Sequence, residues 1–227
     1  AIAAVGSLSA SVVTELQNNA RAMLGGDAEV SLTARPADDA ELSYFLSTAD
    51  TVSTVRDLRS MARNTDGAVM LVELKGVDDL YPLFGQMALT PSQDIAAALA
   101  IRDGVAGAVA EAELFSRLGL DIGDRVAIGN IEVELRAVIG IEPDRTAGVM
   151  ALGPRLMVSA ATLDASGLVR PGSLIETKYR FALDPAADPA LWLENLNAAF
   201  PQAGWRASEY TSAQPALQTF VDRLATL

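Results

Sequence analysis

The side chains that could do chemistry in this sequence are of few kinds. There is no histidine and no cysteine, which excludes Ser-His-Asp triads, thiol nucleophiles, histidine-containing metal sites, iron–sulfur ligation and disulfides. Lys75 and Lys178 are the two lysines, so they are the two candidates for a Schiff base or for the base of a Ser-Lys pair. Each lies inside or at the end of an expected strand, and no serine is marked out as an activated nucleophile.

Carboxylates are the next candidates for catalysis. A glycosidase needs two carboxyl groups at a defined separation, and the sequence contains the adjacent pairs Asp38/Asp39 and Asp78/Asp79. With Asp+Glu 29, such pairs are expected by chance. The first pair also lies where a helix N-terminus favours negative charge. We therefore prefer a structural role for these acids and keep a hydrolase with a carboxylate pair as an alternative.

Two loop segments resemble ligand-binding motifs without matching them. Residues 121–132 begin and end with an acid like a calcium loop, but Gly123 and Arg125 occupy ligand positions and Val126 stands where the turn glycine belongs. The Gly-rich stretch 103–110 lacks the spacing of a dinucleotide fingerprint, and no phosphate-binding P-loop motif occurs. No cofactor is expected for this chain.

Composition narrows the class of protein further. Lys+Arg 17 against Asp+Glu 29 gives 17 − 29 = −12, which disfavours nucleic acid and anionic lipid surfaces as partners. Half of the residues are hydrophobic and mean hydropathy is +0.25, so a sizeable core is expected. The chain begins at Ala1 without a signal peptide or a stretch of about 20 apolar residues. We expect a domain cut from a longer protein.

Hydrophobic periodicity predicts a helix at each end and mixed structure between them. The expected helices cover 3–24, 38–45, 111–118, 189–199 and part of the last fifteen residues, and the expected strands cover 28–34, 51–63, 68–74, 124–128, 131–141, 155–159, 174–183 and 204–207. Residues 77–104 show the least regular pattern. Strand, helix and strand thus occur on both sides of a central segment, which indicates two related α/β halves split by a second lobe.

Three local patterns carry further expectations. Lys75-Gly76 is expected to end the strand 68–74, and Gly129-Asn130 to form a two-residue hairpin turn. In the strand after that turn, we expect the odd-numbered residues of 131–139 to face one side, with the even-numbered Glu132, Glu134 and Arg136 on a solvated face.

An apolar cluster in the irregular segment is the one candidate contact surface. Leu80, Tyr81, Leu83 and Phe84 surround Pro82, and such a cluster most often plugs a hydrophobic gap beneath a loop. The alternative is an exposed patch for a partner or a lipid-like ligand.

Several segments in order resemble the extracytoplasmic domain of FtsX/MacB-type ABC transporter permeases, with the YbbP-like subgroup as the nearest likeness. The helix and turn Glu-Leu-Phe-Ser-Arg-Leu-Gly-Leu-Asp-Ile-Gly-Asp of 113–124, the hairpin that follows and Glu-Pro-Asp at 142–144 are similar to one run of that family. The entry segment 22–30 and the return strand 153–159 are similar to two others. The resemblance covers most of the chain.

The resemblance implies an α+β fold in which a Porter-like subdomain of two βαβ halves, 1–76 and 154–227, is interrupted by a smaller Sabre-like lobe, 77–153. It implies a periplasmic domain of a bacterial inner-membrane permease, with the end helices as stalks that continue into the bilayer. A separate ABC ATPase subunit would bind ATP, and the domain would transmit its motion without catalysis. A permease dimer, a partner esterase of the lysophospholipase type and lipid or hydrophobic-ester cargo are also implied.

Two alternatives come from other classes of function: a free-standing carboxylate-dependent hydrolase and a soluble protein that binds apolar ligands. The family's lipoprotein-releasing members carry a long protruding hairpin, and this sequence shows none, so handover to a periplasmic chaperone is not expected.

Overall fold

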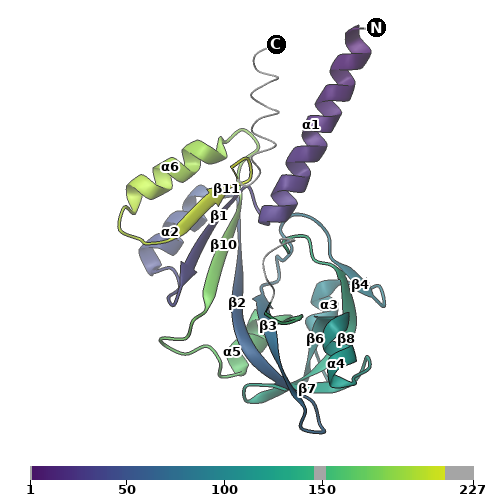
Figure 1. Cartoon of the computed structure of the whole chain (residues 1–227). Coiled ribbons are helices and arrows are strands. Elements are labelled where there is room, and N and C mark those ends of the chain that lie inside the picture. Colours follow the sequence, from purple (N-terminus) through teal and green to yellow (C-terminus); the bar gives the residue numbers. More distant parts are fainter. Residues whose placement is uncertain (1, 146–151, 213–227) are drawn as a thin grey trace.

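The protein is built on one twisted mixed β-sheet with helices on both faces, as shown by the computed structural model, which describes residues 2–145 and 152–212 (Figure 1). The helices in these ranges are α1 (Ile2–Leu24), α2 (Asp39–Thr48), α3 (Ile95–Leu99), α4 (Ala112–Leu118), α5 (Ala160–Ala165) and α6 (Pro189–Ala199). The strands are β1 (Ala28–Thr33), β2 (Thr51–Arg63), β3 (Val69–Val77), β4 (Ala88–Thr90), β5 (Ile101–Arg102), β6 (Val105–Glu111), β7 (Arg125–Ile128), β8 (Ile131–Ile141), β9 (Arg155–Ser159), β10 (Glu176–Ala182) and β11 (Arg206–Glu209).

The strand order is β11-β1-β10-β2-β3-β9-β6-β8-β4, with β5 paired to β6 and β7 paired to β2 and β8. Within it, β1-α2-β2 and β10-α6-β11 are two βαβ units whose strands interleave as an antiparallel group. The two halves predicted from the sequence are therefore confirmed. We call this part the split-βαβ lobe, and we call β3 to β9 with α3, α4 and α5 the insert lobe.

Each lobe has its own hydrophobic core. The split-βαβ lobe packs α2 and α6 on one face of its strands around an aromatic core of Phe45, Tyr179, Phe181 and Trp192. The insert lobe has two cores, one on each face of its part of the sheet. β3 and β9, at the edges of the expected insert, contribute to both of these cores, and the boundaries at 76/77 and 153/154 stay a prediction.

The helix ends follow the sequence signals. Asp38 caps α2 in a capping box with Glu41, because each side chain accepts a hydrogen bond from the other's backbone N–H. Asp188 caps α6 and is followed by Pro189 at its first position. Gly119 ends α4 with φ of 63°, a left-handed conformation. The helix expected from 213 onward lies outside the described residues.

The predicted alternation of β8 is wrong after its middle, because Arg136 forms a bulge opposite β6. Leu135 packs in one insert-lobe core, whereas Ala137 packs in the other, so the bulge exchanges the two faces of the strand. Arg136 is also buried rather than solvated, and it donates hydrogen bonds to the carbonyl oxygens of Ala98, Ala100 and Val105. These hydrogen bonds offset the free-energy cost of burying the guanidinium group.

The structure also differs from the sequence-based prediction in β3, in β6 and at α5. β3 continues through Lys75 and Gly76 instead of ending there, and it pairs in parallel with β9. The Gly-rich stretch 103–110 forms most of β6, a buried strand whose alanines and glycine gave no β signal. The short helix α5 was not predicted.

Candidate functional site

The two faces of β10 carry opposite chemistry. Tyr179 and Phe181 point into the aromatic core, while Lys178 and Arg180 point to the other face. This follows from the alternation of side chains along a strand. The second face of β10 lies toward the insert lobe, and there it joins an extended set of buried ion pairs.

Lys75 of β3 is at the centre of these ion pairs. It is 1% exposed, and its Nζ donates to Glu142 Oε1 at 2.7 Å, to Asp144 Oδ2 at 2.6 Å and to the Tyr81 hydroxyl oxygen at 3.1 Å. An ammonium group has three donors, so each of them is used. Lys75 is thus a buried counter-charge for two carboxylates rather than a free base.

Asp144 connects the two lobes. One of its oxygens accepts from Lys75 in the insert lobe and also from Arg180 on β10 in the split-βαβ lobe. Its other oxygen accepts from the Tyr81 hydroxyl at 2.5 Å. Arg180 is 4% exposed and continues to β1, where its Nε donates to Glu29 Oε2 at 2.9 Å.

A second series of ion pairs, through Asp57, also joins the split-βαβ lobe to the insert lobe. Asp57 of β2 accepts from Lys178 Nζ at 3.0 Å through one oxygen and from Arg155 Nη1 at 3.3 Å through the other. Arg155 of β9 also donates to Glu142 Oε2 at 3.1 Å, which connects this series to the ion pairs of Lys75.

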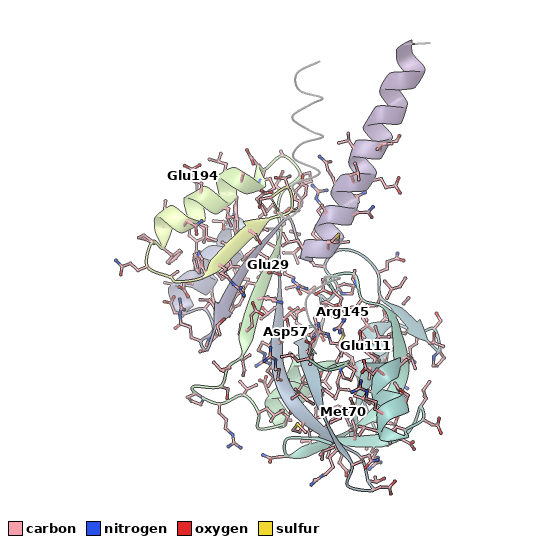
Figure 2. All side chains as sticks on the ribbon, viewed as in Figure 1. Glu29, Asp57, Met70, Glu111, Arg145 and Glu194 are labelled. Atoms are coloured by element: carbon pink, nitrogen blue, oxygen red, sulfur yellow. The ribbon has the colours of Figure 1, made fainter. Side chains whose placement is uncertain are left out.

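Arg145 completes the set at a more exposed position, where it pairs with Glu73 at 3.4 Å and Glu111 at 3.0 Å. Figure 2 shows labelled members of the set extending from the split-βαβ lobe into the insert lobe (Figure 2). We call this set the charge network; it comprises Glu29, Asp57, Glu73, Lys75, Tyr81, Glu111, Glu142, Asp144, Arg145, Arg155, Lys178 and Arg180. Its five cations and six carboxylates almost cancel.

The buried neighbours in the charge network shift the pKa values of Asp144, Asp57 and Tyr81. Burial alone would raise the pKa of Asp144, but Lys75 and Arg180 outweigh it and hold that pKa well below its usual range. Burial likewise opposes ionisation of Asp57, and Lys178, Lys75 and Arg155 lower its pKa. Burial, Asp144 and Glu142 all raise the pKa of Tyr81, so its hydroxyl stays protonated and donates.

The end of α1 and the residue after it pack beside the charge network. Gly25, just after the helix, has φ of 84°, and a Cβ there would lie 2.7 Å from the Arg180 side chain. A Cβ on Gly85 would lie 3.0 Å from Ala22 and 2.5 Å from Pro143, and Pro143 stands between two network carboxylates. The base of α1 is thus packed against the residues that join the two lobes.

Arg21 fastens the same turn of α1 to the split-βαβ lobe. Its Nε lies 2.7 Å from Asp27 Oδ1, and its guanidinium carbon lies 4.8 Å from the centre of the Tyr210 ring. Asp27 in turn accepts a hydrogen bond from the Leu183 N–H at 2.9 Å. The base of α1 is thus joined to the segments that follow β10 and β11.

The structure divides the predicted contact cluster. Tyr81 is 5% exposed and belongs to the charge network, so it is buried beneath the loop, as the first of the two interpretations expected. Leu80 is 50% exposed, and Leu83 and Phe84 are half-buried. A partner contact through Leu80, Leu83 and Phe84 stays a prediction.

One acid of each pair singled out in the sequence has a structural partner. Asp38 caps α2. Asp78 accepts hydrogen bonds from the Ser53 hydroxyl at 2.8 Å and the Thr54 N–H at 2.6 Å. In residues 2–145 and 152–212, no group of three or more acidic side chains is arranged to hold a metal ion.

The charge network itself was missed by the sequence analysis. Its one signal is the Lys-Tyr-Arg-Phe alternation of 178–181, which places cations on the face opposite aromatic residues. Their partners lie in β1, β2 and the loop after β8, so pairing them requires the sheet order.

No family profile matches the chain. A curated relative is the uncharacterised ABC transporter permease YbbP of Escherichia coli K12, with 28% identity over 111 residues. The match covers 49% of this chain and 13% of YbbP, so the chain spans a small part of that relative's length.

Two solved structures share the fold. The periplasmic region of MacB from Actinobacillus actinomycetemcomitans superposes with a TM-score of 0.56 at 9% identity, covering 90% of this chain and 98% of that one. The extracellular domain of the noncanonical ABC-type transporter YknZ from Gram-positive bacteria gives a TM-score of 0.50 at 12% identity, covering 80% of this chain and all of that one. The resemblance to FtsX/MacB-type permease domains is confirmed in sequence by YbbP and in fold by these structures. Among the described residues, no helix has the length and apolar character needed to cross a membrane.

Proposed function

We propose that this chain is the extracytoplasmic domain of an ABC transporter permease and that it works as a mechanical part without catalytic activity or a cofactor. A separate ATPase subunit binds ATP on the cytoplasmic side, and α1 conveys the resulting motion to the two lobes. The sequence similarity to YbbP and the fold shared with the MacB periplasmic region support this assignment.

The mechanical role is supported by how the C-terminal end of α1 packs against the rest of the protein. Gly25, the residue after α1, packs closely against the Arg180 side chain. Ala22 in the last turn lies close to Gly85, which also lies close to Pro143 in the loop of the network carboxylates. Arg180 shares Asp144 with Lys75. A displacement of α1 would therefore act at once on the ion pairs that join the split-βαβ lobe to the insert lobe.

The arrangement of the charged groups supports a non-catalytic role. Lys75 spends its three donors on two carboxylates and Tyr81, and the carboxylates of the charge network are held as counter-ions by buried cations. A general acid or base needs access to a substrate proton. These groups are instead saturated by one another.

The test measures movement of α1 relative to the insert lobe in the full permease with its ATPase subunit, in nanodiscs. The described chain has no cysteine, so spin labels can be placed at Asn18→Cys on α1 and Glu132→Cys on β8, once any cysteine elsewhere in the permease is replaced. We expect the distance between these exposed positions to differ between the nucleotide-free and ATP-trapped states.

The matched control carries both labels within the insert lobe and its adjoining hairpin, at Asp66→Cys and Glu132→Cys, and this distance should stay constant. An unchanged α1 distance while the ATPase hydrolyses ATP would refute the mechanical role. The family assignment would survive that result, because it rests on sequence and fold.

The cargo and the partners are part of the proposal. Lipid or hydrophobic-ester cargo, an esterase of the lysophospholipase type and a permease dimer follow from the likeness to the YbbP-like subgroup. The exposed side chain of Leu80 and the half-buried Phe84 are the proposed contacts. Leu80→Asp with Phe84→Asp should weaken binding of the purified esterase at least tenfold without changing the melting temperature, and equal binding would remove these residues from the proposal.

A further inference from the structure

A pocket of about 390 Å³ lies between the loop after β3, helix α3 and the start of α5. Its apolar lining includes Ile95, Leu99 and Ile101, and Tyr81 also contributes to it. The volume lies at the lower end of the range for small-molecule sites, about 300–1,000 Å³. Tyr81 is the residue that the pocket lining shares with the charge network.

The two carboxylates at this pocket differ in whether they accept hydrogen bonds from the protein. Asp78 accepts hydrogen bonds from the Ser53 hydroxyl and from the Thr54 and Leu80 N–H groups. Asp79 is exposed, and it makes no hydrogen bond or ion pair with any residue in the described ranges. The cations nearby have other partners: Lys75 pairs with Glu142 and Asp144. Arg56 pairs with Asp164, and Arg102 donates to the Ala97 carbonyl oxygen at 2.6 Å. Asp79 therefore gives the pocket an uncompensated negative charge.

Apolar surface remains open beside the pocket. The side chain of Ile101 is 67% exposed and that of Leu80 is 50% exposed. Burying such surface is favourable, in proportion to the apolar area removed from water. A ligand with an apolar body would cover these side chains, and a positive charge on it would meet Asp79.

We propose that this pocket binds small amphiphiles that carry one positive charge, of the alkylammonium type. The apolar chain lies against Ile95, Leu99 and Ile101, and the ammonium group faces Asp79. An anionic amphiphile of the same length would meet repulsion from Asp78 and Asp79 instead. The charge of the rim thus sets the preference, and the apolar lining sets the affinity.

The test uses the 227-residue chain with labelled isoleucine and leucine methyl groups and three probes below their micellar concentrations. The probes are octyltrimethylammonium, octanoate and octyl glucoside. We expect saturable shifts of the Ile95, Leu99 and Ile101 methyl signals with octyltrimethylammonium, and at least tenfold weaker binding of octanoate. Binding should weaken as salt is added, because the rim charge is exposed.

Two variants locate the site. Ala96→Trp places a large side chain at an exposed lining position and should abolish the shifts, while Asp79→Asn should weaken octyltrimethylammonium about three- to tenfold and leave octyl glucoside unchanged. Asp66→Asn, an exposed acid at the β2–β3 turn, is the matched control and should change neither. If Ala96→Trp does not fold, Asp79→Asn decides the question alone.

Equal affinity for octanoate and octyltrimethylammonium would overturn the proposal, as would shifts spread over distant exposed side chains such as Leu46 and Leu191. Binding at micellar concentrations only would overturn it too. This binding measurement is independent of the movement of α1, so the mechanical role and the pocket can fail separately.

Discussion

The aromatic core of the split-βαβ lobe and the charge network pack on opposite faces of the same strands. On one face, Phe45 lies 5.0 Å from the ring of Phe181 and 5.3 Å from that of Tyr179. On the other face, Arg180 and Lys178 are held by carboxylates from β1, β2 and the loop after β8. Apolar burial is non-directional, whereas a buried charge requires its specific partner in place. The lobe is thus held together by one kind of interaction and joined to its neighbour by another.

The largest expected effect comes from breaking the charge network at its centre. Lys75→Met leaves Glu142 and Asp144 buried beside one fewer cation, and it should lower the free energy of unfolding by about 3–5 kcal/mol. Urea denaturation at pH 7 measures this. Phe45→Ala in the aromatic core should cost a similar amount, about 3–5 kcal/mol.

The two substitutions should separate when the pH is lowered to 4. Lys75→Met removes one of the two cations that lower the pKa of Asp144. Asp144 then takes up a proton more readily, so the loss should shrink, while the loss from Phe45→Ala should stay constant. Identical losses at both pH values for Lys75→Met would show that packing, not charge, determines its effect.

The second expected effect is an acid dependence of the unmodified protein. Asp144 and Asp57 have folded pKa values below their usual range, so the unfolded chain binds more protons in acid. Their stabilisation is fully present above the unfolded value of about 3.9 and is lost as the pH falls below it. Urea midpoints between pH 2 and 6 should fall toward the acid end, and less steeply in Asp144→Asn. A curve for Asp144→Asn as steep as that of the unmodified protein would contradict the assignment.

A smaller effect is expected where α1 meets the charge network. Gly25→Ala should cost about 1–3 kcal/mol, because the backbone is left-handed there and the new Cβ would meet Arg180. Gly67→Ala is the control, since Gly67 has φ of 88° with open space around it. Thermal denaturation should show a larger loss for Gly25→Ala, and equal losses would mean that Arg180 moves aside freely.

The smallest expected effect on stability concerns the start of α6, the helix that packs on the aromatic core. Asp188→Ala removes the side chain that accepts from Ala190 and Leu191 at the start of α6, and it should cost about 1 kcal/mol. The exposed Glu194 in the same helix provides the control (Figure 2), and Glu194→Ala should change stability by less than about 0.5 kcal/mol. A loss from Glu194→Ala as large as that from Asp188→Ala would remove the cap as the explanation.

The features that were predicted correctly from the sequence are those that depend on local signals. The starts of α2 and α6 and the hairpin turn at Gly129 depend on caps and turns a few residues long, and they were found. The bulge at Arg136 and the continuation of β3 through Lys75 depend on neighbouring strands, so they were not. The charge network pairs residues up to 151 positions apart, and no spacing rule in one sequence can pair them. The pocket beside Tyr81 likewise exists only once α3 packs on the sheet.

The length of β2 has a consequence for how the molecule can deform. This strand has 13 residues, pairs with β10 in the split-βαβ lobe and with β3 and β7 at its other end. At about 3.3 Å per residue it is roughly 43 Å long. No flexible linker separates the lobes along it, because its hydrogen-bonded ladder runs from one into the other. A pull on one lobe would therefore be taken up as bending and twisting of a continuous sheet and not at a hinge along β2.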